Sequence, residues 1–177
     1  MDAAVNVLVV FYSRYGSSER LALAAGVGAI QAKAAIRLRR VADLADARTI
    51  DAAPEWRDSL DRMNRDYVVP RPADPEWADV IVLATPPDSS GEIESYCASL
   101  RSLGSMAGKI AAPLTVGDRE SALRPIYAAA ACAGMLVAPQ NADAEDPIAA
   151  AREHGRRITE MARALKGLGR RSDEFLR

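Results

Sequence analysis

The sequence is poor in the residues from which metal and redox sites are usually built. Its 177 residues contain two cysteines and one histidine. Cys97 and Cys132 lack the Cys-x-x-Cys spacing of metal or redox pairs and lie in apolar helical surroundings, so we expect both to be small buried hydrophobic residues. His154 stands beside a glycine on a charged helix, where a surface residue is expected. The sequence therefore predicts no metal site.

The chain also has little net charge and no long hydrophobic run. Its formal net charge is -1 at pH 7, with acidic and basic residues mixed along the sequence. No overall field then draws the protein to nucleic acid or to an anionic membrane. The apolar run at 5–12 is too short to cross a bilayer, and no basic segment precedes it. We therefore expect a cytoplasmic protein without nucleic-acid or membrane partners.

Five short apolar segments have the patterns of β-strands. Residues 5–12 are almost continuously β-branched or aromatic, which is typical of a central strand buried on both faces of a parallel sheet. Residues 35–41 alternate apolar and charged positions, as expected at a sheet edge. Three further strands are predicted, at 77–86, 109–116 and 135–139. Pro113 is unfavourable for the fourth, because proline cannot donate a hydrogen bond to a ladder.

Helical patterns separate these strands. They are expected at 18–30, over a short stretch from Pro54, at 93–103, at 119–133 and around 158–165. Tyr96 and Cys97 fall on the core-facing stripe of the third. The alternation predicts a three-layer, doubly wound α/β domain around a five-stranded parallel sheet. We expect one domain over 1–166 and a charged tail at 167–177 that frays.

A hydroxyl-rich loop follows the first strand. Ser13, Ser17 and Ser18 surround Gly16 just before a helix. Outward backbone N–H groups and the positive end of the helix dipole favour a phosphate there, and glycine permits close approach. Arg14 either adds charge-assisted bonds or is simply solvated. Neither GxGxxG nor GxxxxGK[ST] is present, which argues against an ordinary dinucleotide fold and a P-loop NTPase.

Helix capping is a simpler interpretation of the same loop. Ser17 or Ser18 would cap the helix, while Glu19 would complement the dipole in the first turn. Capping needs only one serine, so the additional hydroxyls favour a phosphate site at the carboxyl end of the first strand, where ligands of such sheets bind.

Several segments together resemble one known family. Residues 12–19, Tyr-Ser-Arg-Tyr-Gly-Ser-Ser-Glu, look like its flavin-phosphate loop, and residues 77–86 look like the strand that leads to its second flavin loop. Its fourth strand, fifth strand and final helix are matched by residues 108–111, 133–139 and 149 onward. On these segments, which span nearly the whole chain, the sequence resembles the flavodoxin-like WrbA-type NAD(P)H:quinone oxidoreductases.

The resemblance implies a flavodoxin-like sheet of order 2-1-3-4-5 and a bound FMN. Hydride would pass from NAD(P)H to the flavin and then to a quinone, and dimers or tetramers are implied. No catalytic side chain is singled out. The FMN contacts carried over from the family are Ser13, Arg14, Tyr15, Gly16, Ser17, Ser18, Thr85, Pro86, Pro87, Asp88, Ser89, Val116 and Gly117.

The second and third flavin loops depart from the family pattern. An Arg-Phe-Gly-Asn segment that supports the flavin ring is absent after Thr85-Pro86, and the chain continues directly with Pro87 to Gly91. The third loop is shorter and carries Asp118 and Glu120, while Cys-Ala-Gly-Met replaces the family's His-His-Gly-Met at 132–135. A flavodoxin-like binding or scaffold protein that keeps only an anion site is therefore the alternative function.

Overall fold

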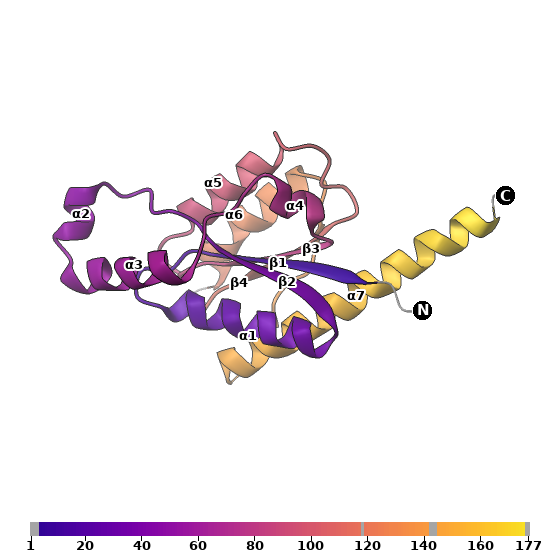
Figure 1. Cartoon of the computed structure of the whole chain (residues 1–177), viewed down its shortest axis with the longest axis horizontal. Helices are drawn as coiled ribbons and strands as arrows, with labels where there is room; N and C mark the ends of the chain where they lie inside the picture. Colours follow the sequence, from indigo (N-terminus) through magenta and orange to yellow (C-terminus); the bar gives the residue numbers. More distant parts are fainter. Residues whose placement is uncertain (1–3, 118, 142–144, 176–177) are drawn as a thin grey trace.

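The computed structural model describes residues 4–117, 119–141 and 145–175 and contains one parallel sheet (Figure 1). The strand order is β2-β1-β3-β4-β5, which confirms the predicted topology. The second strand lies at the edge, as its alternating pattern predicted. The strands are β1 (Val5–Phe11), β2 (Ala34–Arg40), β3 (Val80–Ala84), β4 (Ile110–Leu114) and β5 (Leu136–Val137).

Helices cover both faces of this sheet. They are α1 (Ser17–Gln31), α2 (Ala47–Asp51), α3 (Pro54–Asp66), α4 (Ala73–Trp77), α5 (Gly91–Leu100), α6 (Arg119–Cys132) and α7 (Pro147–Phe175). One hydrophobic core lies between the sheet and the α1–α7 layer, and a second lies under α5 and α6. The helices α2 and α3 lie beyond the carboxyl edge of the sheet (Figure 1).

The position of β1 between two helix layers explains its continuous apolar sequence. Val7 and Val9 point into the core beneath α1 and α7, whereas Leu8 and Val10 point into the core beneath α5 and α6. All four side chains are fully buried. A strand with packed helices on both sides has no solvent face, so its apolar run is continuous rather than alternating.

Pro113 is tolerated because of the shortness of β5. The carbonyl of Ala111 accepts from the Ala138 N–H on the β5 side of β4. Pro113, two residues later, faces the same side, but β5 pairs only with Ile110 and Ala111. The missing proline N–H therefore falls beyond the end of that ladder.

The helices α1 and α7 cross at backbone contact. A β-carbon placed on Gly28 would lie 1.8 Å from the carbonyl oxygen of Arg152, and one placed on Gly155 would lie 2.0 Å from the carbonyl oxygen of Ala25. Neither neighbour is a flexible side chain. Glycine is thus required at both positions for this helix pair to approach.

An ion pair fastens α3 to α1. Glu19 is buried, and its carboxylate accepts from Arg62 Nη1 at 2.8 Å, from Arg62 Nη2 at 2.6 Å and from the Tyr67 hydroxyl at 2.6 Å. The Tyr67 ring also packs edge-on against Phe11, with 4.9 Å between centroids. Glu19 therefore anchors a neighbouring helix, beyond the dipole role that its position in the sequence suggested.

Two predictions from the sequence are wrong. His154 is buried on the inner face of α7, where burial, aided by the charge of Arg157, lowers its pKa to about 4. Cys132 is exposed because α6 ends there, whereas Cys97 is buried as expected. The helix α7 continues past Gly167 to Phe175 and projects beyond the sheet (Figure 1). The division of the chain at residue 166 and the fraying of the tail stay predictions.

We expect Gly28→Ala and Gly155→Ala each to lower the free energy of unfolding by at least about 2 kcal/mol, because the added methyl group forces two backbones apart. Chemical denaturation monitored by circular dichroism measures this. Gly167→Ala is the matched control: nothing lies within 4 Å of its new β-carbon, so it should stabilise α7 by up to about 1 kcal/mol. Equal effects at all three glycines would contradict the crossing.

The Glu19 contacts should make stability depend on pH. Hydrogen bonds from Arg62 and then Tyr67 hold the pKa of Glu19 below its ordinary value of 4.5, against the opposing effect of burial. Their stabilisation is complete above pH 4.5 and is lost as pH falls through the lower folded-state pKa. Glu19→Gln should therefore cost about 1–3 kcal/mol at pH 7, and this difference from wild type should shrink at acid pH.

Denaturant titrations of both proteins at pH 7 and at progressively lower pH measure that gap. Asp58→Asn, on the exposed side of α3, should remain close to wild type at pH 7. A Glu19→Gln effect that is equally large at every pH would show that the carboxylate charge is unimportant.

Candidate functional site

Three loops meet at the carboxyl edge of the sheet. They follow the adjacent strands β1, β3 and β4 and comprise residues 12–16, 85–90 and 115–117. In open α/β sheets this edge is where ligands bind. The structure thus brings together all the segments that contain the expected FMN contacts.

The first loop turns sharply through Gly16. Its φ of 94° lies in the left-handed region that favours glycine. Ser13 is buried, and its Oγ accepts from the Gly16 N–H at 2.9 Å. Gly16 is the N-cap of α1, and no side chain caps this helix. The capping role considered for Ser17 and Ser18 is therefore wrong, and the first N–H groups of α1 remain available to a ligand.

Ser18 lies in the first turn of α1 with its hydroxyl enclosed. Its Oγ is buried and has no hydrogen-bond partner among the described residues. A buried hydroxyl without a partner costs free energy unless a ligand or water satisfies it. The hydroxyl, the uncapped N–H groups and the helix dipole together favour an anion. Ser17 is half-buried beside them, whereas Tyr15 is 60% exposed.

Arg14 bridges the first and second loops. Its Nη2 donates to Ser89 Oγ at 2.9 Å, and its Nη1 lies 3.7 Å from the Asp88 carboxylate. The guanidinium also lies 4.7 Å from the ring centroid of Trp56. These contacts hold a positive charge between the first and second loops and offset the exposed charge of Asp88. Arg14 thus has several side-chain partners, unlike a solvated surface arginine.

The second and third loops are bonded to each other. Thr85 Oγ1 donates to the Ser89 carbonyl at 2.9 Å, and Thr115 Oγ1 donates to the Thr85 carbonyl at 2.8 Å. A β-carbon on Gly117 would lie 3.7 Å from Pro87 Cγ, so these loops touch at their tips. Pro86 is buried behind Pro87, and Val116 packs against the α1–α7 core. The two loops therefore form one continuous part of the carboxyl edge.

Residues that the sequence analysis missed hold these loops in place. Asp43 accepts from the Tyr12 hydroxyl at 3.1 Å, Trp56 Nε1 at 3.0 Å and Arg40 Nη2 at 2.6 Å. Gln140 donates to the Thr115 carbonyl and accepts from its N–H. Asp43 and Gln140 follow β2 and β5, so their positions after strands were an available signal. Trp56 gave none, because it comes from an inserted helix.

Of the two acidic residues near the third loop, the structure describes Glu120, and its charge is paired. The Glu120 carboxylate pairs with Arg124 on the exposed side of α6, and Asp118 lies outside the described residues.

Within the part of the chain that the structure describes, no group of three His, Cys, Asp or Glu side chains is placed to hold a metal ion. In the same described ranges, no helix has both the length and the apolar character needed to cross a membrane.

Known structures share this fold. The chain superimposes on an archaeal flavodoxin with a TM-score of 0.62 and 14% identity, covering 89% of this chain and 99% of that one. A two-electron reduced flavodoxin from Megasphaera elsdenii gives a TM-score of 0.58 and 17% identity over 87% and 98%. A flavone reductase also gives 0.58, with 16% identity over 92% of this chain and 64% of the other. These identities establish the flavodoxin-like fold alone.

Sequence comparison identifies the family to which the chain belongs. No profile of a known protein family matches the chain. However, an NAD(P)H dehydrogenase (quinone) from Deinococcus radiodurans is 30% identical over 150 residues, which cover 78% of this chain and 74% of the relative. At that identity and coverage, and with the topology and loops described above, the chain belongs to the flavodoxin-like, WrbA-type family of NAD(P)H dehydrogenases (quinone).

Proposed function

We propose that this protein binds FMN and uses NAD(P)H to reduce quinones by two electrons. The observation that carries the proposal is the uncapped start of α1, where the enclosed Ser18 hydroxyl has no partner among the described residues. The named relative and the flavodoxin-like neighbours support a flavin phosphate as the missing partner.

The residues of the first loop fit a phosphate. The Ser18 hydroxyl can donate to it, as can the N–H groups at the start of α1, and Ser13, Tyr15 and Ser17 contribute the remaining polar groups of the loop. Gly16 keeps the approach open. Arg14 supplies positive charge without entering the backbone cradle. These five residues and Ser18 form the proposed phosphate site.

The ring side of the site is built differently. Neither 85–90 nor 115–117 contains an aromatic residue, so Thr85, Pro86, Pro87, Asp88, Ser89, Val116 and Gly117 would contact the ring through backbone groups and small side chains. Contact between Pro87 and Gly117 makes this surface continuous. Hydrogen bonds from Thr85 and Thr115 keep it in place. We propose that the ring is supported by a preformed backbone surface.

When bound, FMN would supply the redox chemistry, which is the two-electron reduction of a quinone to the hydroquinone at the expense of NAD(P)H and one further proton. The residues of the chain bind and orient the cofactor. Arg14 is positioned by Ser89 and Trp56, so its charge is available to offset negative charge on the cofactor. Arg14 Nε also donates to the Tyr12 hydroxyl at 3.4 Å, and that hydroxyl donates to Asp43. Asp43 therefore helps to hold Arg14 in position through Tyr12.

Titration of the flavin-free protein with FMN tests the phosphate site. Ser18→Ala should weaken FMN binding by about 10- to 100-fold, since a hydrogen bond to a charged group contributes about 1.5–3 kcal/mol. Ser105→Ala is the control, because Ser105 is exposed and lies outside the three loops. This variant should bind FMN as tightly as wild type. Flavin absorbance and fluorescence quenching measure the affinities.

The reconstituted protein should then oxidise many equivalents of NAD(P)H per flavin when a quinone is present, and no more than about one equivalent in anaerobic buffer without a quinone. Micromolar FMN that produces neither a bound spectrum nor thermal stabilisation would contradict the proposal. It would favour the alternative of a binding or scaffold protein that keeps only an anion site, which the comparisons do not favour.

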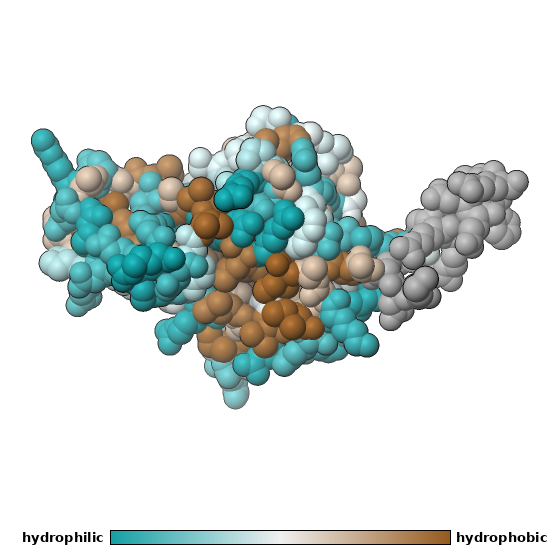
Figure 2. Space-filling view, viewed as in Figure 1, coloured by the Kyte–Doolittle hydropathy of each residue, from teal (hydrophilic) through white to brown (hydrophobic). Residues whose placement is uncertain are grey.

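We further propose that the protein is cytoplasmic and forms homodimers or homotetramers. The outer side of α1 carries Leu23, Val27 and Ile30, which are 42%, 41% and 53% exposed. Their spacing places them on one stripe. Figure 2 shows apolar residues gathered over α1 and the adjoining edge strand β2. An exposed apolar patch of this kind is typical of an interaction surface, which supports a second subunit against this face.

Val27→Lys should shift the protein toward its monomer mass of 19.0 kDa, because a lysine at the centre of the stripe would bury a charge in the interface. Light scattering after gel filtration measures the mass. Ala131→Lys, an exposed position on α6, should leave the assembly unchanged. A wild-type protein that is already monomeric at high concentration would contradict association through α1.

A further inference from the structure

A large cavity lies beside the three loops and is lined by none of their residues. Its volume is about 520 Å³, within the range of small-molecule sites. One wall is formed by two connecting segments, and the other by one face of α5 and the turn that follows this helix. The apolar residues of the first wall are Val41, Ala42, Leu44, Val69, Pro70 and Pro72.

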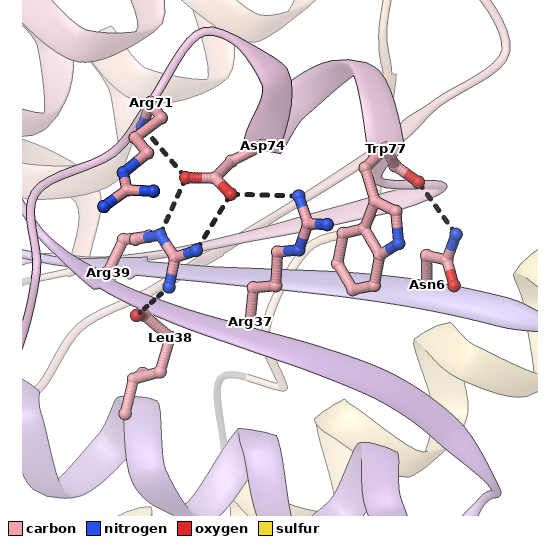
Figure 3. A network of polar contacts seen from close by, with 7 residues as sticks. All are labelled: Asn6, Arg37, Leu38, Arg39, Arg71, Asp74 and Trp77. Atoms are coloured by element: carbon pink, nitrogen blue, oxygen red, sulfur yellow. Dashed lines mark hydrogen bonds and ion pairs between the residues drawn. The ribbon is translucent and has the colours of Figure 1, made fainter.

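Ion pairs hold the proline-rich wall in place (Figure 3). The buried Asp74 carboxylate accepts from Arg39 Nε at 2.7 Å and from Arg37 Nη1 at 3.1 Å, and it also accepts from the backbone N–H of Arg71 at 2.9 Å. The segment that carries Val69 to Pro72 is therefore tied directly to the edge strand β2. The cavity is preformed and has no need of a ligand to order this wall.

The opposite wall is a helix face with small side chains. Ser95, Tyr96 and Ser99 lie on this face of α5, and Ser102 and Leu103 continue the wall in the turn after Leu100. Tyr96, expected in the core, is half-buried here, and its enclosed hydroxyl has no partner among the described residues. Small residues where α5 could have carried leucines leave the space open.

The cavity adjoins the proposed FMN site through the start of α5. Glu92 lines the cavity and accepts from Ser89 Oγ at 3.0 Å, and Ser89 accepts from Arg14 of the phosphate loop. Leu44, from the other wall, lies 4.0 Å from the β-carbon position of Gly91. One end of the cavity is thus next to the second loop, whereas its walls extend away from it.

We propose that this cavity holds the hydrocarbon side chain of a lipophilic quinone whose ring reacts at the neighbouring flavin site. The inference rests on the proposed function. The cavity takes a part of the substrate that does not react, because no residue of the three loops lines it. That part is apolar, because seven of the thirteen lining residues are aliphatic or proline and the only charged ones among the thirteen are Arg71 and Glu92. The protein consequently selects quinones with long apolar substituents over bare rings.

Filling the cavity tests this selection. Ser99→Phe adds an aromatic ring to the lining face of α5, and Ala98→Phe adds the same ring at the adjacent exposed position, which does not line the cavity. Val69→Asp is a second variant that introduces charge from the opposite, exposed wall. The probes are a fully substituted benzoquinone with a decyl side chain and tetramethylbenzoquinone, since fully substituted rings cannot alkylate the exposed Cys132.

In the FMN-loaded wild type, KM should be at least tenfold lower for the decyl compound than for tetramethylbenzoquinone. Ser99→Phe and Val69→Asp should each raise KM for the decyl compound about tenfold and leave KM for tetramethylbenzoquinone unchanged. Ala98→Phe should match wild type with both. Equal KM values for the two quinones in wild type, or equal effects of both phenylalanine variants, would overturn the inference.

A second readout avoids the flavin. Calorimetric titration of the flavin-free protein should show binding of the decyl compound to wild type and to Ala98→Phe and at least tenfold weaker binding to Ser99→Phe. That result would support the cavity assignment even if the FMN-loaded protein reduced no quinone, an outcome that would refute the proposed function alone. Absence of decyl-compound binding to the flavin-free wild type would overturn the cavity assignment.

Discussion

The position of α1 against α7 is the constraint on which the site depends. Gly28 and Gly155 let the two helices touch through their backbones, and Glu19 fixes the other end of α1 to α3. Because α1 starts directly after Gly16, these packing contacts also determine where its free N–H groups point. A core feature with no ligand contact of its own thereby positions the proposed phosphate site.

The carboxyl edge combines a polar cradle with loops that are internally satisfied. The hydroxyls of Thr85 and Thr115 donate to neighbouring backbone carbonyls, and the Gln140 side chain pairs with both the N–H and the carbonyl of Thr115. Ser18 is the contrasting case, because its buried hydroxyl lacks a partner among the described residues. An unsatisfied donor surrounded by satisfied ones marks the position at which a ligand lowers the free energy most.

The sequence predicted the sheet and the loops well because both follow from local patterns. Continuous apolar residues revealed β1, and the carboxyl-edge rule located 13–18 without knowledge of tertiary contacts. The errors arose where burial depends on distant partners. His154 is buried because α7 packs deeply against α1, a consequence of glycines in both helices. Trp56 and Asp43 support Arg14 only because an inserted helix folds back over the carboxyl edge.

Loss of the aromatic residue from the second loop changes how flavin binding energy is distributed. An aromatic side chain would bury a large apolar area against the ring, whereas Pro87 and Gly117 offer a smaller surface. The phosphate loop then contributes a larger share of the binding free energy. The start of α5 that follows this short loop lies close to Leu44, where the apolar cavity begins. Under the proposed function, recognition therefore depends more on the cofactor's phosphate and on the substrate's side chain than on the flavin ring.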